Sequence, residues 1–320
     1  MIVIFLLLVQ SIGGFRRLLD GIAETWPLGV AGVITLYTLV MLIRTLRWKF
    51  LLQSNDIDVS FSLLAKVAWI AWAQNGVLPA RLGEFSRLYI LKDREDVPVS
   101  VTTASILLEK FFDLFGLLFV LASSALMFSN SSSELQSSFL TNVQLLGILV
   151  FVGALGILST IAFDEFYLKL LEKMPLKNKI VPLFTRFRDS SKILLQRKVK
   201  FLYVLLISIL QWFIEAMTIV FVSWSFGFTI DIFAIIFAAI VGYATYIFPI
   251  TPGSLGPFEL FVGQLLQIIG NIPQDLATKI PFVTHILVIT YLGVTSVIAS
   301  LLLGEKIENS GMQDKEGSDS

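Results

Sequence analysis

Apolar runs of about 20 residues recur along the chain, and each is long enough to cross the hydrocarbon core of a bilayer once as a helix. The runs are continuous rather than alternating, which is typical of helices and not of the strands of a barrel. The pattern therefore predicts an all-α polytopic membrane protein with about six transmembrane helices. The expected spans are roughly 28–50, 100–128, 143–163, 201–226 and 282–303, with a shorter first span over 1–15.

Two further apolar segments, 62–91 and 232–271, are interrupted. The first break, from Asn75 to Arg87, contains Pro79, Gly83 and three charged residues, and the second, Pro249 to Glu259, contains three prolines and two glycines. Helix breaks within lipid are tolerated only where protein or a cavity satisfies the freed backbone groups. Two breaks, one in each half of the chain, point to a site for a polar substrate near the bilayer midplane.

Lysine and arginine are distributed unevenly between the connections. The segment 164–200 holds ten basic and four acidic residues and is predicted to be cytoplasmic, whereas the Ser-rich loop 129–142 has no basic residue and is predicted to lie outside. With these sides fixed, 62–91 enters and returns on the cytoplasmic side, and 232–271 does so on the outer side. Two re-entrant hairpins of opposite orientation are typical of inverted-repeat transporters, so we expect the two breaks to approach each other. The alternative is that each segment is one kinked span or two plain spans.

The chain is expected to form a single transmembrane domain, residues 1–304, in the cell membrane. Within it, 164–200 forms either amphipathic surface helices or a solvated basic loop. Residues 305–320 are polar and are expected to be a disordered cytoplasmic tail. Residues 1–15 lack a basic n-region, which favours a span over a cleaved signal peptide.

Composition supports the membrane prediction and excludes several other classes. Hydrophobic residues make up 56% of the 320 positions, charged residues only 15%, and the mean hydropathy is +0.82, which no ordinary soluble domain would show. The net charge of zero gives no reason to expect a nucleic-acid partner. The chain has no cysteine and one histidine, so thiolate and multi-histidine metal sites are excluded, and no cofactor is expected. No nucleotide-binding, GxSxG or HExxH motif is present, so nothing positive supports an enzyme.

The first group of candidate residues lies within the first break. Arg81, Glu84 and Arg87 are spaced three apart and would share one helix face, with Asn75 just before them. Arginine offers a planar fork of donors that suits a phosphate or carboxylate. We therefore expect these residues to bind a lipid headgroup, the alternative being a cluster that snorkels to the cytoplasmic interface.

The second group lies inside the expected span 100–128. Glu109 and Asp113 are four apart and share one face, whereas Lys110 is expected to point elsewhere. Ionisable groups within a span are costly unless they are paired or hydrated. We therefore expect Arg81 or Arg87 to pair with Glu109 or Asp113, unless this part of the span sits at a wet boundary.

The third group belongs to the second break. Gly253 and Gly256 permit unusual turns, and a helix restarting near Pro257 would present free N–H groups and its positive end to an anion. Glu259 falls in the first turn of that helix, where it is either part of the site or a simple helix-start residue. Weaker candidates are Gln211 with Glu215, for which a proton-coupling or a structural role is open, and His285, for which a structural role is expected.

The motifs together resemble the transmembrane region of lysylphosphatidylglycerol synthases, the flippase-like integral membrane family. The resemblance rests on R-T-L-R-W at 44–48, N-x-x-L-P-x-R-x-G-E-x-x-R at 75–87, E-K-x-x-D at 109–113 and P-x-x-P-G-x-L-G-x-x-E at 249–259. It implies a polytopic module that binds and translocates aminoacylated phospholipid. In the multiple peptide resistance factor proteins this module precedes a soluble aminoacyl-transferase domain. We expect no such domain here, so transfer from tRNA is not carried over.

The resemblance leaves the lipid and the exact role open. Archaeal relatives are linked to glycosyltransferases of polyprenyl-phosphate pathways, so the expected ligand is a phospholipid or a polyprenyl-phosphate-linked lipid. The chain is then either a flippase-like transporter or a non-transporting partner that presents lipid to a separate synthase or glycosyltransferase. A membrane-embedded transferase with Glu109 or Asp113 as base is a third alternative. Homo-oligomerisation is compatible with each of them.

Overall fold

The computed structural model describes residues 15–25, 27–78, 81–129, 164–173, 177–228, 231–246, 251–270 and 272–318. The expected span 143–163, and the span 1–15 except for its last residue, lie outside these ranges. Every regular element within the described ranges is helical, which confirms the all-α prediction. The elements are α2 (Phe15–Thr25), α3 (Leu28–Gln53), α4 (Phe61–Val77), α5 (Glu84–Glu95), α6 (Val99–Ser129), α8 (Asp164–Leu171), α9 (Lys177–Gln196), α10 (Lys198–Ser225), α11 (Ile232–Ala244), η2 (Pro252–Ser254), α12 (Pro257–Gly270) and α13 (Gln274–Ser318).

Three helices in the described part of the chain are long and apolar enough to cross a membrane. They are α3, α10 and the part of α13 from Gln274 to Gly304. The expected count of about six transmembrane helices is therefore not confirmed. The helix α6 is also long, at 31 residues, but carries Glu109, Lys110 and Asp113 in its interior.

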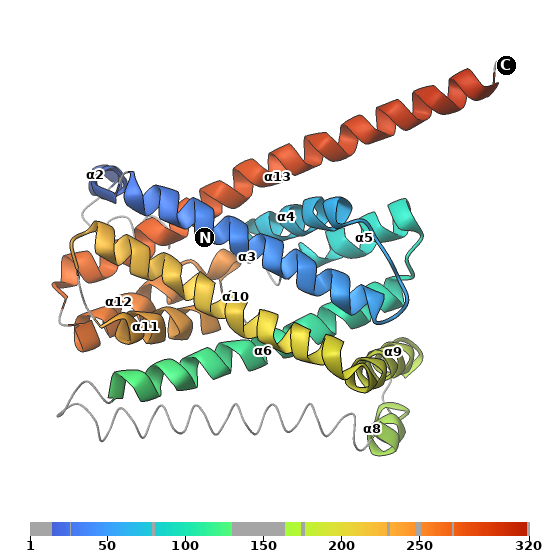
Figure 1. Cartoon of the computed structure of the whole chain (residues 1–320), viewed down its shortest axis with the longest axis horizontal. Coiled ribbons are helices and arrows are strands. Elements are labelled where there is room, and N and C mark those ends of the chain that lie inside the picture. The colour runs from blue at the N-terminus through green and yellow to red at the C-terminus, as the bar shows by residue number, and fades with distance from the viewer. Residues whose placement is uncertain are drawn as a thin grey trace.

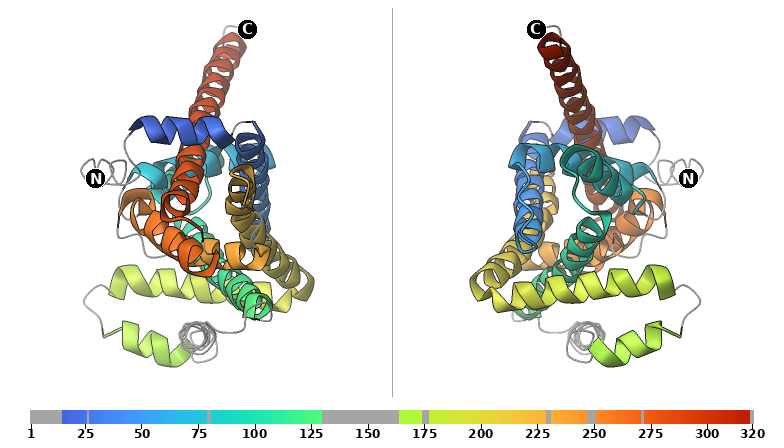
Figure 2. Two further views of the ribbon diagram at one scale, coloured as in Figure 1. Left: turned by 90° about the vertical axis from the view of Figure 1, so that its left-hand side faces the viewer. Right: turned by 90° about the vertical axis from the view of Figure 1, so that its right-hand side faces the viewer.

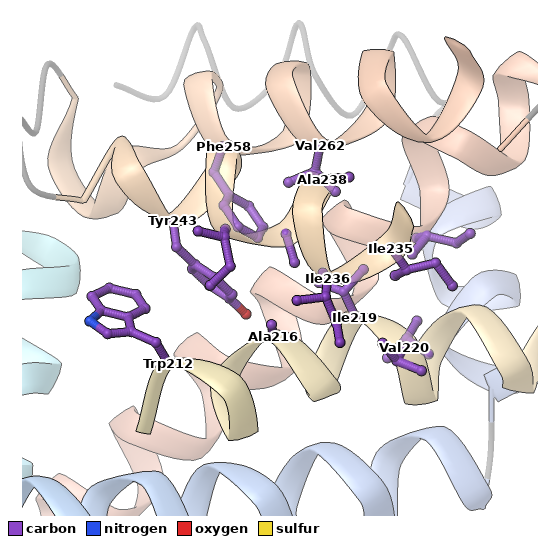
Figure 3. Packing of buried hydrophobic residues seen from close by; sticks show 14 of the residues in the cluster. Trp212, Ala216, Ile219, Val220, Ile235, Ile236, Ala238, Tyr243, Phe258 and Val262 are labelled. Atoms are coloured by element: carbon purple, nitrogen blue, oxygen red, sulfur yellow. The ribbon is translucent and has the colours of Figure 1, made fainter. Parts of the chain in front are cut away.

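The helices pack around one large apolar core. The helix α3 lies along α10, which also packs against α6 and α11, and α13 packs against α4 and α12 (Figure 1). Side chains from α10, α11 and α12 meet in this core, where Ile219, Ile236 and Phe258 are almost fully buried (Figure 3). Apolar side chains on the outer faces of α3, α10 and α13 remain exposed, as expected for surfaces that face lipid.

Contacts between connections define two ends of this helical body. At one end, which we call the basic end, Leu52 and Val59 pack with Leu91, and Arg197 pairs with Asp56 at 3.1 Å. The helices α8 and α9 lie side by side there (Figure 2), which agrees with surface helices rather than a plain loop for 164–200. At the opposite end, Lys279 at the start of α13 pairs with Glu24 of α2 at 2.7 Å.

Each interrupted segment folds back on itself. The helices α4 and α5 pack together and both have their outer ends at the basic end, while α11 and α12 pack together and open toward the other end. Gly83 permits the first fold, because a Cβ atom there would lie 2.2 Å from the carbonyl oxygen of Ala71. The structure therefore contains the two helical hairpins of opposite orientation that the sequence predicts.

The last helix is longer than the sequence suggests. The backbone of α13 is helical to Ser318, whereas a disordered tail is expected over 305–320. No proline follows Pro281, so no residue after Gly304 interrupts the backbone hydrogen bonds of the helix in that way. In Figure 1, α13 projects beyond the other helices, and the hydrogen bond from Arg94 to the carbonyl oxygen of Leu303 at 3.3 Å places its later turns at the basic end.

Candidate functional site

The two breaks meet in the middle of the molecule. A Cβ atom on Gly253 would lie 2.6 Å from the carbonyl oxygen of Gly76, so only glycine allows the two backbones to come this close. Gly253 also has a φ of +60°, in the left-handed region that glycine adopts without strain. Arg81 bridges the same junction, since its Nη1 donates to the carbonyl oxygen of Tyr246 at 2.8 Å. The expectation that the breaks approach each other is confirmed.

Arg87 is the centre of a buried ion-pair cluster behind the first break. Its Nη2 donates to Glu109 at 2.6 Å and its Nη1 to Glu84 at 3.0 Å, and its guanidinium stacks on Trp48 at 3.8 Å. The predicted pairing of Arg87 with Glu109 is thus confirmed. Only 2% of Arg87 is exposed, so this arginine has no free face for a ligand.

The neighbouring acidic group on α6 pairs with the second arginine of the R-T-L-R-W motif. Arg47 of α3 donates to Asp113 at 2.7 Å and to Ser208 at 3.0 Å, and it is fully buried. The expectation that Lys110 points away is wrong. Its Nζ lies 3.2 Å from Glu84 and 3.7 Å from Asp113, because Asp113, three positions on, shares its helix face and α5 brings Glu84 to the same face.

A second buried pair joins α3 to α10. The Nη2 of Arg44 donates to both carboxylate oxygens of Glu215, at 2.9 and 2.7 Å, and Gln211 donates to the same carboxylate at 3.5 Å. Arg44 is 3% exposed and Glu215 also 3%. Arg44 and Arg47 were visible in the sequence as two charges inside the expected span 28–50, and the cost of unpaired charge at that depth was the signal for them.

One tryptophan of α4 is surrounded by cations. The Trp72 ring has the guanidinium carbon of Arg44 at 3.7 Å, that of Arg81 at 5.1 Å and the Nζ of Lys110 at 5.4 Å. An aromatic face attracts cations without neutralising them. Trp72 therefore helps to hold positive charge at the junction of the two breaks.

A cavity of about 40 Å³ lies at this junction. Arg81 lines it with a side chain that is 20% exposed, and the only ion pair of this side chain within the described residues is a 4.0 Å contact from its Nε to Glu84. Arg81 Nε and the side-chain oxygen of Asn75 are buried there without a hydrogen-bond partner in the described part of the chain. Such orphaned polar atoms require water or a ligand. The other lining residues include Tyr37, Trp72, Gly76, Tyr246, Gly253, Ser254 and His285.

His285 of α13 lines this cavity, and Glu259 of the second break lies behind it as its partner. Glu259 accepts from the backbone N–H of Gly256 at 2.8 Å and contacts Nδ1 of His285 at 2.5 Å. The Nε2 of His285 in turn lies 2.9 Å from the hydroxyl of Tyr246. The N–H of Gly256, expected as part of an open anion site, is therefore already used by the chain's own carboxylate, which caps the helix that follows.

The predicted site residues thus fall into two layers. Asn75, Arg81 and Gly253 line the cavity itself. Glu84, Arg87, Glu109 and Asp113 form the ion-pair cluster behind one wall, and Gly256 and Glu259 support the other. Arg44, Arg47, Trp72, Tyr246 and the pairing of His285 were not predicted.

Comparison with known proteins agrees with these motifs. The family model for the lysylphosphatidylglycerol synthase TM region matches residues 1–296. The chain belongs to this family. Among its relatives is a UPF0104 membrane protein of Methanocaldococcus jannaschii, 26% identical over 195 residues, which are 61% of this chain and 79% of the relative. Another, from Methanothermobacter thermautotrophicus, is 23% identical over 287 residues, 84% of this chain and 82% of the relative.

One relative of this chain has a name that states an activity. The glycosyltransferase AglD of Haloferax volcanii is 23% identical over 263 residues, which are 73% of this chain but 42% of that protein. No solved structure matches the chain.

Proposed function

We propose that this protein binds the phosphate of a membrane lipid between its two hairpins and moves the lipid across the bilayer, as a flippase-like transporter. The observation that carries the proposal is Arg81. It is the arginine at the junction of the breaks that lines the cavity, keeps part of its side chain exposed and lacks a close carboxylate partner. A guanidinium in this setting offers two parallel donors to a phosphate.

The ion-pair cluster then serves to position this arginine rather than to bind lipid directly. Two buried ion pairs, Arg87–Glu109 and Arg47–Asp113, have contacts of 2.7 Å or less. Their charges neutralise each other, and no side chain among them is exposed to a ligand. They hold α3, α5 and α6 together, and Glu84 connects them to Arg81. This arrangement separates the roles of Arg81 and Arg87, which the sequence treats alike.

The size of the cavity indicates that transport needs a conformational change. At about 10–15 Å³ for each water, 40 Å³ holds a few waters and no headgroup. A lipid can enter only if the hairpins separate at the Gly76–Gly253 contact, which also releases Arg81 from Tyr246. Because one hairpin opens toward each end, separation on one side at a time would give alternating access.

A non-transporting role is the second candidate. It is favoured by the similarity to a glycosyltransferase of which this chain matches only a part. In that case the same arginine would hold a phospholipid or a polyprenyl phosphate for a separate enzyme at the membrane. Both roles predict lipid binding, and only the first predicts movement between leaflets.

The test combines binding with transport. Arg81→Ala should abolish binding of phosphatidylglycerol or a polyprenyl phosphate, and Arg81→Lys should recover only part of it, because an ammonium lacks the fork. Arg186→Ala, which removes an exposed arginine from α9, is the matched control and should behave like the parent. Transport is measured as the loss of fluorescence of labelled lipid in liposomes when an impermeant quencher is added. Binding by a well-folded Arg81→Ala variant would overturn the site, and binding without transport would favour the presenting role.

A further inference from the structure

We infer that the Glu259–His285 pair takes up a proton when the lipid phosphate binds, so that anion binding and proton binding are coupled. The inference rests on the proposed function and adds to it a source of energy. It is based on the charges around the cavity and on the Glu259–His285 pair, in which the partner of the carboxylate is a histidine and not an arginine or lysine.

The charged side chains of the described residues around the junction sum to zero when His285 is neutral. Five basic side chains face five carboxylates: Arg44, Arg47, Arg81, Arg87 and Lys110, against Glu84, Glu109, Asp113, Glu215 and Glu259. Four of these carboxylates have an arginine or lysine at 3.2 Å or less. For Glu259, the ion-pair partner within the described residues is His285.

Among the described residues, Arg81 and Glu259 are therefore the two charges of this group that lack a close, permanently charged partner. Arg81 lines the cavity, and Glu259 lies directly behind His285, which also lines it. Tyr246 connects them, since its carbonyl oxygen accepts from Arg81 and its hydroxyl lies 2.9 Å from Nε2 of His285. Without a bound anion, the charges of Arg81 and Glu259 offset each other in the sum of charges around the junction. A phosphate that pairs with Arg81 removes this compensation and leaves Glu259 as an uncompensated buried charge, which is costly at 2% exposure.

Protonation of His285 restores the balance. In the neutral form, Nδ1–H donates to Glu259 and Nε2 accepts from the Tyr246 hydroxyl. A proton arriving through cavity water adds to Nε2, which then donates to the tyrosine oxygen, while the imidazolium remains paired with Glu259. Histidine is the side chain that changes charge near neutral pH. The other groups that line the cavity with His285 are Arg81 from the first break, Tyr246 from the turn after α11, Tyr37 from α3, and the non-titrating Trp72 and Asn75 from α4.

The experiment measures protons and lipid together. The full chain in phosphatidylcholine nanodiscs is titrated with short-chain phosphatidylglycerol between pH 5.5 and 8.5, and calorimetry in buffers of different ionisation enthalpy counts the protons taken up. A second titration with geranylgeranyl phosphate distinguishes a phosphodiester from a phosphomonoester ligand. We expect about one proton per lipid at high pH, and an affinity that falls about tenfold per pH unit there, as linkage to one proton requires.

Two variants test the pair itself. His285→Gln should bind weakly at every pH with no proton uptake, whereas Glu259→Gln, which removes the charge that needs compensation, should bind tightly at every pH. Thr278→Val, on the same helix outside the cavity, should match the parent. Lipid binding by the parent with a flat pH profile and no proton uptake would overturn the coupling and leave the proposed function standing. Absence of binding of both lipids at every pH would overturn the proposed function itself.

Discussion

At the scale of single residues, buried charge pairs decide how the helices are held together. Arg44 and Glu215 join α3 to α10 through two hydrogen bonds that one guanidinium nitrogen donates to the two carboxylate oxygens, and neither residue is more than 3% exposed. A pair of this kind contributes less than its Coulomb attraction suggests, because both charges have lost their hydration. Removing one partner of the pair is nevertheless strongly destabilising, because the other charge stays buried without hydration.

This asymmetry gives a stability prediction. Arg44→Met should destabilise the protein by about 3–5 kcal/mol, and adding Glu215→Leu should recover most of that loss. Thermal unfolding in detergent micelles measures both. The control is Lys49→Met, which breaks the exposed contact to Asp58 at 3.5 Å and should change the melting temperature little. Equal effects of the Arg44 and Lys49 variants would mean that the buried pair is not structural.

Some partners of the buried charged residues could be predicted from the sequence and others could not. The Arg87–Glu109 pair was predictable because two charges inside neighbouring apolar segments had to find partners. The partner of Arg44 was not, because 171 positions separate it from Glu215 and no spacing rule connects them. A structural role was expected for His285, but its contact with Glu259, 26 positions away on another helix, could not be predicted from spacing.

At the scale of elements, the two hairpins and their contact are the main feature. Their existence was predictable from proline and glycine within apolar segments, and their orientation from the basic connection 164–200. The atomic reason for the contact was not, because a glycine that permits a turn looks the same in sequence as one that admits another backbone. Gly253 does both.

Comparing two glycines separates these roles. Gly253→Ala should cost more than Gly227→Ala, since both have positive φ but only the first would place a Cβ atom against a carbonyl oxygen. The strain shared by both is about 1–3 kcal/mol. Unfolding measurements on both variants give the difference. Equal losses would show that the hairpins can separate at Gly76 without cost.

At the scale of the whole molecule, the two ends carry different connections. The loop after α3, the end of α5, the helices α8 and α9 and the later turns of α13 gather at the basic end. The start of α13 and α2 lie at the other. This arrangement follows from where the long helices begin and end, which the hydropathy pattern located to within a few residues for α3, α6 and α10.

Because the natural chain has no cysteine, its orientation can be mapped with single substitutions. Asp275→Cys, at the start of α13, should react with an impermeant maleimide on intact cells. Asp96→Cys, at the basic end, should react only after permeabilisation, since basic connections face the cytoplasm. The reverse pattern would invert the assigned orientation, and equal labelling of both would contradict two separate ends.

The long separation of the Arg44–Glu215 pair also has a consequence for how the protein is made. At about 5–20 residues per second, the ribosome adds Glu215, 171 positions on, roughly 9–34 s after Arg44. During that interval α3 carries a guanidinium whose partner has not yet been synthesised, and Asp113, the partner of Arg47, follows only partway through it. The helix α3 therefore has partners for both arginines only after α6 and α10 have been made. It has to stay beside the insertion machinery or at the headgroup layer until α10 arrives, so the order of translation differs from the order in which the helices settle in lipid.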